Sequence, residues 1–194
     1  SATVMSNTES IFSSFFSFLK FCVIFNLLFS INNINNSNTN TYNYNDYNEC
    51  FPEKRPKIVR MLKEALADGA PISGMGMQSH LTMDHPDLEL YKFALEKYGA
   101  LGLIIHATEL DIHNADPSDE SMQALADRYA ELFSIYVDAK KNGTANVECV
   151  TFWNLLDEES WLTGFRKERS YPLLFWKGGQ PKKAYQAVID VASK

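Results

Sequence analysis

The sequence predicts an α/β fold of the (β/α)₈ barrel type. The first observation is an alternation of short apolar runs and amphipathic segments from Tyr42 onward, in the order βαβαβαβα, which indicates a parallel sheet with helical crossovers. The second is that polar residues follow each apolar run at its C-terminal end, the edge at which a barrel assembles its active site. An open doubly wound sheet is disfavoured because the sequence contains no glycine-rich phosphate loop.

The composition changes near Tyr42 and predicts two regions, 1–41 and 42–194. Residues 11–31 are mainly Phe, Ile, Leu, Ser and Asn, and residues 32–48 read NNINNSNTNTYNYNDYN. One interpretation is a membrane anchor, since residues 11–31 have about the ~20-residue length of a membrane helix. The other is translated non-coding sequence, because Phe, Ile, Asn, Lys and Tyr have AT-rich codons. Both alternatives stay open from sequence alone.

The first elements of the folded region are predicted from periodicity. YNYNDYN ends a strand, and a helix follows Pro56 and stops at Asp68, because apolar residues recur there at helical spacing. PISGMGMQSHL, residues 71–81, reads as a strand whose glycines suggest close backbone approach. The next helix begins at Leu88 and ends at Gly99.

The remaining elements continue the same alternation. LGLIIHATELDI, residues 101–112, is a strand expected to be buried on both faces. Asp116 is the expected N-cap of a long helix, with Pro117 at its first position. VECVTFW, residues 147–153, is another strand, and residues 184–192 give a final helix.

Charge and cysteine content argue against two kinds of function, nucleic-acid binding and metal or cofactor binding. The net charge is −6 and the basic residues are dispersed, so the chain is not expected to bind nucleic acid. Cys22, Cys50 and Cys149 lack the spacing of metal ligands, so neither a metal nor another cofactor is expected.

Two strand ends carry side chains that can act together. Gln78 and His80 share one strand face, and Glu109 and Asp111 share another, because side chains alternate along a strand. If these strands are neighbours, the two imidazole nitrogens of His80 reach one carboxylate each. Asp111 would then orient the ring and Glu109 would be held ionised as a candidate nucleophile. The alternative is that these polar groups cap adjacent loops.

Four motifs resemble the glycoside hydrolases of family 10, the retaining endo-1,4-β-xylanases. They are NDYN at 45–48, GMQSHL at 76–81, TELDI at 108–112 and TFWNLLDEESW at 151–161, in this order and spacing. The resemblance covers the chain from Tyr42 to its end and corresponds to the fifth through eighth βα units of the barrel. It implies xylan or xylooligosaccharides as substrate and a secreted, extracellular enzyme, with a membrane-anchored form as the alternative.

The resemblance also implies roles for individual residues. Glu109 would be the nucleophile that attacks the anomeric carbon of a xylose unit, with His80 and Asp111 as its hydrogen-bonded support. The residues implied to contact the sugar are Gln78 beside the nucleophile, Trp153 and Trp161 as aromatic walls, and Asn45 and Tyr47 on the leaving-group side.

One part of the family's machinery is missing from the sequence. A retaining glycosidase needs a second carboxyl, about 5 to 5.5 Å from the nucleophile, as general acid and base. In this family it belongs to a motif resembling W-D-V-x-N-E at the end of the fourth strand, which this sequence does not contain. Glu49, in YNEC, is the one candidate to replace it.

Length leads to the same expectation. A complete barrel typically takes about 250 residues, so we expect residues 42–194 to be the C-terminal half of the catalytic domain, with little activity unless an N-terminal half is supplied. A non-catalytic half-barrel that binds xylan is the alternative.

Overall fold

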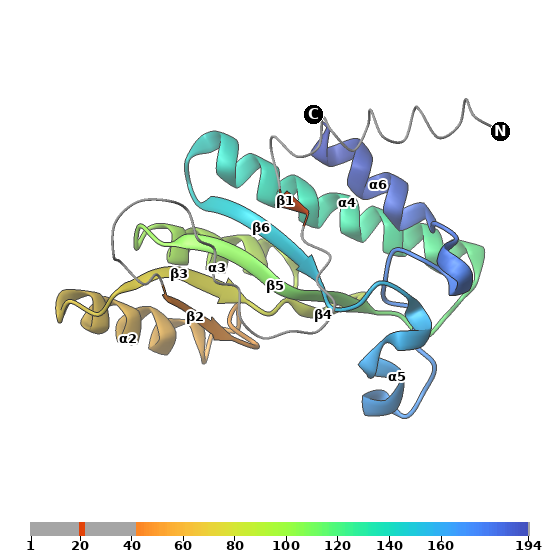
Figure 1. Cartoon of the computed structure of the whole chain (residues 1–194), viewed down its shortest axis with the longest axis horizontal. Helices are drawn as coiled ribbons and strands as arrows, with labels where there is room; N and C mark the ends of the chain where they lie inside the picture. Colours follow the sequence, from red (N-terminus) through yellow and green to blue (C-terminus); the bar gives the residue numbers. More distant parts are fainter. Residues whose placement is uncertain (1–19, 22–41, 194) are drawn as a thin grey trace.

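The computed structural model describes residues 20–21 and 42–193 (Figure 1). Apart from residues 20 and 21, the segment 11–31, for which a membrane anchor is one interpretation, lies outside the described residues. Within the described part, none of the helices combines the length and apolar character that crossing a membrane requires.

The described strands form a parallel sheet. They are β1 (Lys20–Phe21), β2 (Tyr42–Asp46), β3 (Ile72–Met77), β4 (His80–Thr82), β5 (Ile104–His113) and β6 (Asn146–Phe152). Their order is β1-β6-β5-β3-β2, and β4 pairs with β5 beyond the end of β3. Each pairing is parallel, as the alternation of strands and helices predicts.

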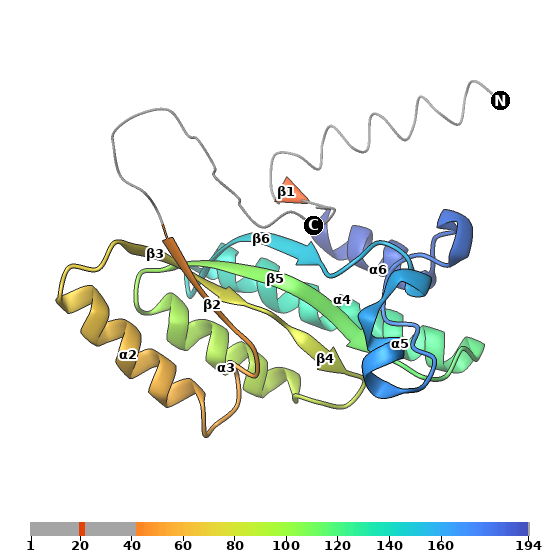
Figure 2. The same ribbon diagram turned by 60° about the horizontal axis from the view of Figure 1, so that its bottom comes forward.

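The first three helices connect successive strands along one side of the sheet, and the last two follow β6. They are α2 (Arg55–Ala67), α3 (Leu88–Gly99), α4 (Asp119–Asn142), α5 (Trp161–Arg166) and α6 (Lys183–Ala192). Figure 2 shows α2, α3 and α4 side by side beneath the strands, and α6 packs against α4. The carboxyl ends of β4 and β5 instead meet the segment that contains α5, as Figure 2 shows.

The strand predicted for residues 71–81 is divided in two. β3 ends at Met77 and β4 begins at His80, because Ser79 takes a left-handed conformation with φ of 63°. Gln78, between the two strands, still hydrogen-bonds to both neighbouring strands through its backbone. Its N–H donates to the carbonyl of Asp46 at 3.1 Å, and its carbonyl accepts from the N–H of Glu109 at 3.0 Å.

The glycine-rich sequence of β3 makes room for side chains of β2. A Cβ added at Gly76 would lie 2.5 Å from Oδ1 of Asn45 and 3.0 Å from Cγ2 of Thr108. The expectation of close backbone approach is met at Gly74, where an added Cβ would lie 3.1 Å from the carbonyl oxygen of Ile104, whereas at Gly76 neighbouring side chains fill the space that a larger residue would need.

The long helix α4 begins later than predicted. Ser118 is its N-cap and accepts from the N–H of Ser121 at 3.3 Å. Asp116, the expected cap, instead accepts from the N–H and the hydroxyl of Ser118 at 2.9 and 2.8 Å. Both are good capping residues, and Asp116 is used to fold the loop that positions Ser118.

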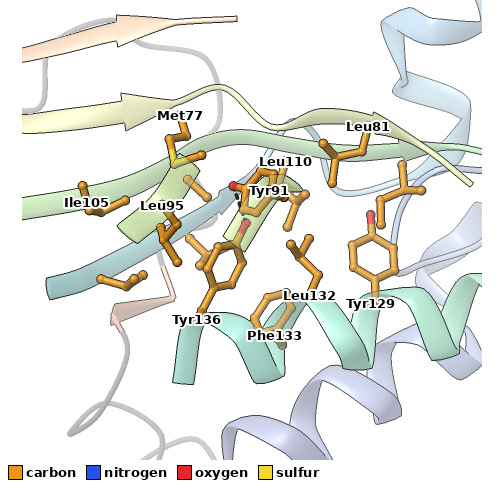
Figure 3. Packing of buried hydrophobic residues seen from close by; sticks show 14 of the residues in the cluster. Met77, Leu81, Tyr91, Leu95, Ile105, Leu110, Tyr129, Leu132, Phe133 and Tyr136 are labelled. Atoms are coloured by element: carbon orange, nitrogen blue, oxygen red, sulfur yellow. Dashed lines mark hydrogen bonds between the residues drawn. The ribbon is translucent and has the colours of Figure 1, made fainter. Parts of the chain in front are cut away.

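The core lies between the sheet and the helices (Figure 3). The hydroxyls of Tyr91 and Tyr136 point toward one another there and hydrogen-bond at 2.8 Å. On β5, Ile105 joins this core, whereas Ile104 is only partly buried. The successive residues Leu110, Asp111 and Ile112 are all buried, so the prediction that this strand is buried on both faces is confirmed at its C-terminal end and is wrong at its first residues.

A buried ion pair joins the two ends of the long connection between β6 and α6. Nζ of Lys182 lies 3.0 Å from Oδ2 of Asp157, and the two side chains are 1% and 2% exposed. Burial raises the pKa of Asp157 and lowers that of Lys182, while their mutual attraction opposes both shifts. Asp157 also accepts from the N–H of Leu173, and Lys182 donates to the carbonyl of Tyr171, each at 2.8 Å.

Replacing Lys182 with Met should destabilise the protein strongly, because Asp157 would then be buried without its cation. We expect the free energy of unfolding to fall by about 3 to 5 kcal/mol in urea denaturation. Lys183→Met is the matched control, since Lys183 is exposed, and its effect should stay within about 0.5 kcal/mol. Equal effects of the two substitutions would contradict this role for the ion pair.

Candidate active site

The imidazole of His80 lies between two carboxylates of β5. Its Nδ1 is 2.9 Å from Oδ1 of Asp111, and its Nε2 is 3.4 Å from Oε2 of Glu109. The predicted contact of one histidine with both acids is therefore present. It arises from parallel pairing of β4 with β5, in which His80 is the register partner of Asp111.

The two carboxylates differ in their access to water. The side chain of Asp111 is fully buried, whereas that of Glu109 is 17% exposed. An ion without access to water must be satisfied by protein hydrogen bonds. Asp111 meets this requirement from two sides, because Trp161 donates its indole N–H to Oδ2 at 2.9 Å while His80 contacts Oδ1.

The electrostatics of this group favour a positively charged imidazole. Burial alone would lower the pKa of His80, but the hydrogen bond and charge of Asp111, together with the charge of Glu109, raise it overall. Burial raises the pKa of Asp111, and the hydrogen bonds from His80 and Trp161 oppose this shift. Because the two groups interact closely, they titrate as a pair.

Asn45 holds the other oxygen of Glu109. Its Nδ2 donates to Oε1 of Glu109 at 3.1 Å, and its Oδ1 accepts from the hydroxyl of Thr108 at 2.8 Å. Thr108 thus fixes the orientation of the amide and was missed by the sequence reasoning. The signal in the sequence that could have indicated this contact was Gly76 on the adjacent strand. A side chain at that position would collide with Asn45 and Thr108.

Aromatic rings surround His80. The ring centroids of Trp153 and Trp161 lie 6.3 and 5.1 Å from that of His80, in edge-to-face arrangements. Both indoles are 38% exposed, so part of each ring is open to a ligand. Phe165, which is 65% exposed, packs against Trp161 at 4.8 Å between centroids.

Gln78 and Tyr47 are placed differently. Gln78 is half-buried next to His80, and its backbone bridges β2 and β5. Tyr47 is 57% exposed and packs under Lys54, whose Nζ lies 3.9 Å from the ring centroid. The structure therefore joins Gln78 to the neighbouring strands through its backbone and gives Tyr47 a contact with Lys54.

Asp46 stabilises the turn that follows β2. Its carboxylate accepts from the hydroxyl of Tyr44 and from Nζ of Lys54, each at 2.6 Å. Burial would raise the pKa of Asp46, but these hydrogen bonds outweigh it and lower the pKa. The motif NDYN contains Asp46, but Lys54 lies outside the motif. The sequence therefore did not predict the contact between Lys54 and Asp46.

Glu49 is not open to a ligand. It is 2% exposed, and burial raises its pKa to about 7. A carboxyl buried in this way is unsuited to protonate a departing sugar, so the stand-in considered for the general acid is not supported. Within the described residues, no group of three or more His, Cys, Asp or Glu side chains could hold a metal ion.

The burial of Glu49 predicts a specific pH dependence of stability. In the unfolded chain a glutamate ionises near pH ~4.3, whereas the folded pKa is about 7. Between these values the folded protein binds more protons, so its stability falls as pH rises and levels off above the folded pKa. Glu49→Gln lacks this decline. From about pH 5 to about pH 8, the wild type should lose up to about 3 kcal/mol relative to Glu49→Gln in urea unfolding. A difference that is independent of pH would contradict this.

Gly76→Ala should disturb the support of Glu109. The added methyl group would meet Oδ1 of Asn45 and push this amide away from the carboxylate. We expect a loss of about 1 to 3 kcal/mol in the free energy of unfolding and a changed NMR signal of the Asn45 amide protons. Gly164→Ala in α5 is the control, since no atom lies within 4 Å of its added Cβ. An unchanged Asn45 signal in Gly76→Ala would overturn this view of the site.

Comparison with known proteins identifies the family. The model of glycosyl hydrolase family 10 matches residues 34–191. The chain is 60% identical over 141 residues to endo-1,4-beta-xylanase B of Butyrivibrio fibrisolvens, covering 73% of this chain and 22% of that protein. It is 39% identical over 155 residues to an endo-1,4-beta-xylanase of Geobacillus stearothermophilus, covering 74% and 46%.

Solved structures agree with this assignment. The GH10 xylanase of Thermobacillus composti superposes with a TM-score of 0.71 at 39% identity, covering 77% of this chain and 52% of that chain. A GH10 endoxylanase from a sugarcane soil metagenome gives a TM-score of 0.72 at 34% identity, covering 77% and 48%. The chain spans about half the length of these structures and less than half of the two relatives above. From its sequence, its parallel sheet and its motifs, the chain belongs to glycosyl hydrolase family 10, and its fold is about half of that family's (β/α)₈ barrel.

Proposed function

We propose that this chain carries the nucleophile side of a retaining endo-1,4-β-xylanase, with Glu109 as the nucleophile. The observation that carries the proposal is the way in which the carboxylate is held. Asn45 donates to one oxygen at 3.1 Å, His80 lies 3.4 Å from the other, and the side chain remains 17% exposed. A carboxylate that is oriented from both sides and reachable from outside is suited to nucleophilic attack.

The proposed reaction forms and then breaks an ester with Glu109. An oxygen of its carboxylate attacks the anomeric carbon of a xylose unit as the glycosidic C–O bond breaks, and the departing oxygen takes a proton from a general acid. Water, deprotonated by the same acid in its basic form, then hydrolyses the ester. His80 faces the nucleophile at 3.4 Å, and Asp111 holds the ring in place at 2.9 Å.

The general acid is proposed to come from the other half of the barrel. Two carboxyl groups other than Glu109 interact electrostatically with His80. They are Asp111 and Glu49, and both are buried. Neither is accessible to the oxygen of a leaving group. We therefore propose that residues 42–194 hydrolyse xylan only when an N-terminal barrel half supplies the acid.

The aromatic residues support a xylan chain as the ligand. Trp153 and Trp161 leave part of each indole open next to His80, and the C–H faces of a pyranose ring pack well on such surfaces. Gln78 is proposed to hydrogen-bond a sugar hydroxyl there. Because the polymer is too large to enter a cell, we propose that the enzyme acts outside it, either secreted or anchored through residues 11–31.

A second candidate function rests on the same aromatic residues. The exposed indoles do not depend on a general acid, so the chain could hold xylan without cutting it. This is the non-catalytic half-barrel. It shares the ligand of the first proposal and differs from it only in the reactivity of Glu109.

Covalent trapping distinguishes the two functions. A 2-fluoro-xylobiosyl fluoride should label Glu109 even when the acid is absent, because fluoride leaves without being protonated. We expect peptide mass spectrometry of the labelled chain to place one glycosyl group on Glu109. Glu109→Gln is the control and should stay unlabelled, since a neutral amide is a weak nucleophile. Binding of xylobiose to an unlabelled wild-type chain would favour the non-catalytic function.

A further inference from the structure

The segment 160–171 carries the exposed rings of Trp161 and Phe165 but buries little of itself. It contains α5, a helix of only six residues, and residues 164–169 are all exposed. A segment with so few buried contacts is held weakly by hydrophobic packing and opens easily. Its position therefore depends on specific hydrogen bonds to its neighbours.

Both ends of this segment are attached to the carboxyl end of β5, where Figure 2 shows α5. At its start, the indole N–H of Trp161 donates to Oδ2 of Asp111 at 2.9 Å. At its end, the N–H of Tyr171 donates to the carbonyl of Asn114, the residue after β5, at 2.7 Å. The exposed residues lie between these two contacts, so a further contact is needed to hold them.

The imidazole of His113 makes this further contact. Its Nδ1 lies 2.9 Å from Oγ of Ser170, and its Nε2 lies 3.1 Å from Oε1 of Glu168. The N–H of Ser170 donates to Oγ1 of Thr163 at 3.2 Å, and Thr163 belongs to α5. His113 is therefore linked through Ser170 to the helix that begins with Trp161.

The two contacts of His113 differ in their expected strength. The side chain of Glu168 is 53% exposed, and an exposed ion pair contributes little. Ser170 is 0% exposed, and a buried hydroxyl that loses a hydrogen bond also bears the cost of its desolvation. The contact between His113 and Ser170 is thus the one that fixes the segment.

One face of β5 holds both the proposed nucleophile and this segment. Glu109, Asp111 and His113 occupy alternate positions of the strand, so their side chains share a face. Asp111 binds the indole of Trp161 and His113 binds the returning end of the segment. The aromatic side chains are therefore held by the same strand that carries Glu109.

We propose that His113 is a positioning residue for Trp161. By binding Ser170 it holds the segment 160–171 against β5, so that the indole keeps its hydrogen bond to Asp111 and its contact with Phe165 at 4.8 Å between centroids. The use of this aromatic surface to bind xylan rests on the proposed function, whereas the contacts that position it do not.

Hydrogen exchange of the Trp161 indole N–H tests the proposal in the full chain without any sugar. Its ¹⁵N NMR signal is identified by its loss in Trp161→Phe. In His113→Ala this proton should exchange about tenfold faster, relative to the backbone N–H of Leu132 in the core helix α4. His85→Ala is the matched control, because His85 is exposed and its ring packs on Phe51 instead. It should leave this ratio unchanged.

Two further variants keep the test decisive. Ser170→Ala removes the partner hydroxyl and should accelerate the Trp161 proton in the same way if His113→Ala does not fold. His113→Asn should keep the exchange slow, because an amide group can take the place of Nδ1 and hydrogen-bond to Ser170.

Three results would overturn the proposal. They are an unchanged exchange rate at Trp161, an equal acceleration at Trp161 and Leu132, and a His113→Asn variant that exchanges as fast as His113→Ala. An equal acceleration would mean that His113 supports the fold as a whole. Because no sugar is present, the covalent trapping of Glu109 is judged separately from all of these results.

Discussion

The arrangement of the site depends on one fully buried carboxylate. Asp111 is 0% exposed and accepts hydrogen bonds from His80 on one oxygen and from Trp161 on the other. A buried anion is tolerated only when its acceptor sites are filled, so both donors are held where Asp111 requires them. His80 also faces Glu109, and Trp161 is one of the two exposed indoles beside His80. A single constraint therefore organises the proposed reacting group and part of the sugar contact.

The surrounding fold supplies the geometry for this constraint. Beyond the break at Ser79, β4 pairs with β5 as β3 does, and His80 is the register partner of Asp111. Gly76 leaves the volume that Asn45 needs beside Glu109. At the far end, the buried pair of Lys182 and Asp157 fixes the connection that includes Trp161. Each of these features restricts a side chain of the site from a different element.

Sequence reasoning predicted the part of the site that follows from strand geometry. The contact of His80 with Glu109 and Asp111 follows from side-chain alternation on two neighbouring parallel strands, and it is present. The parallel sheet followed from the alternation of elements. The start of α4 was wrong, because Asp116 and Ser118 are both good caps and the choice between them depends on the loop.

Other contacts could not be predicted because irregular segments produce them. Trp161 reaches Asp111 across 50 positions of sequence, through a connection without periodicity. The pairing of Asp157 with Lys182 has the same origin. The left-handed turn at Ser79 has no glycine to signal it, so the division of this strand was also hidden. These contacts come from tertiary packing, which overrides the local pattern.

The position of protons on His80 tests the central arrangement most directly. With ¹⁵N-labelled histidine, the ring nitrogens of His80 can be observed in the full chain near pH 6. The account requires protons on both nitrogens, because Nδ1 faces Asp111 and Nε2 faces Glu109 and the pKa of His80 is raised. An Nε2 without a proton at that pH would contradict it, since the imidazole would then present a lone pair to the carboxylate that it is proposed to hold.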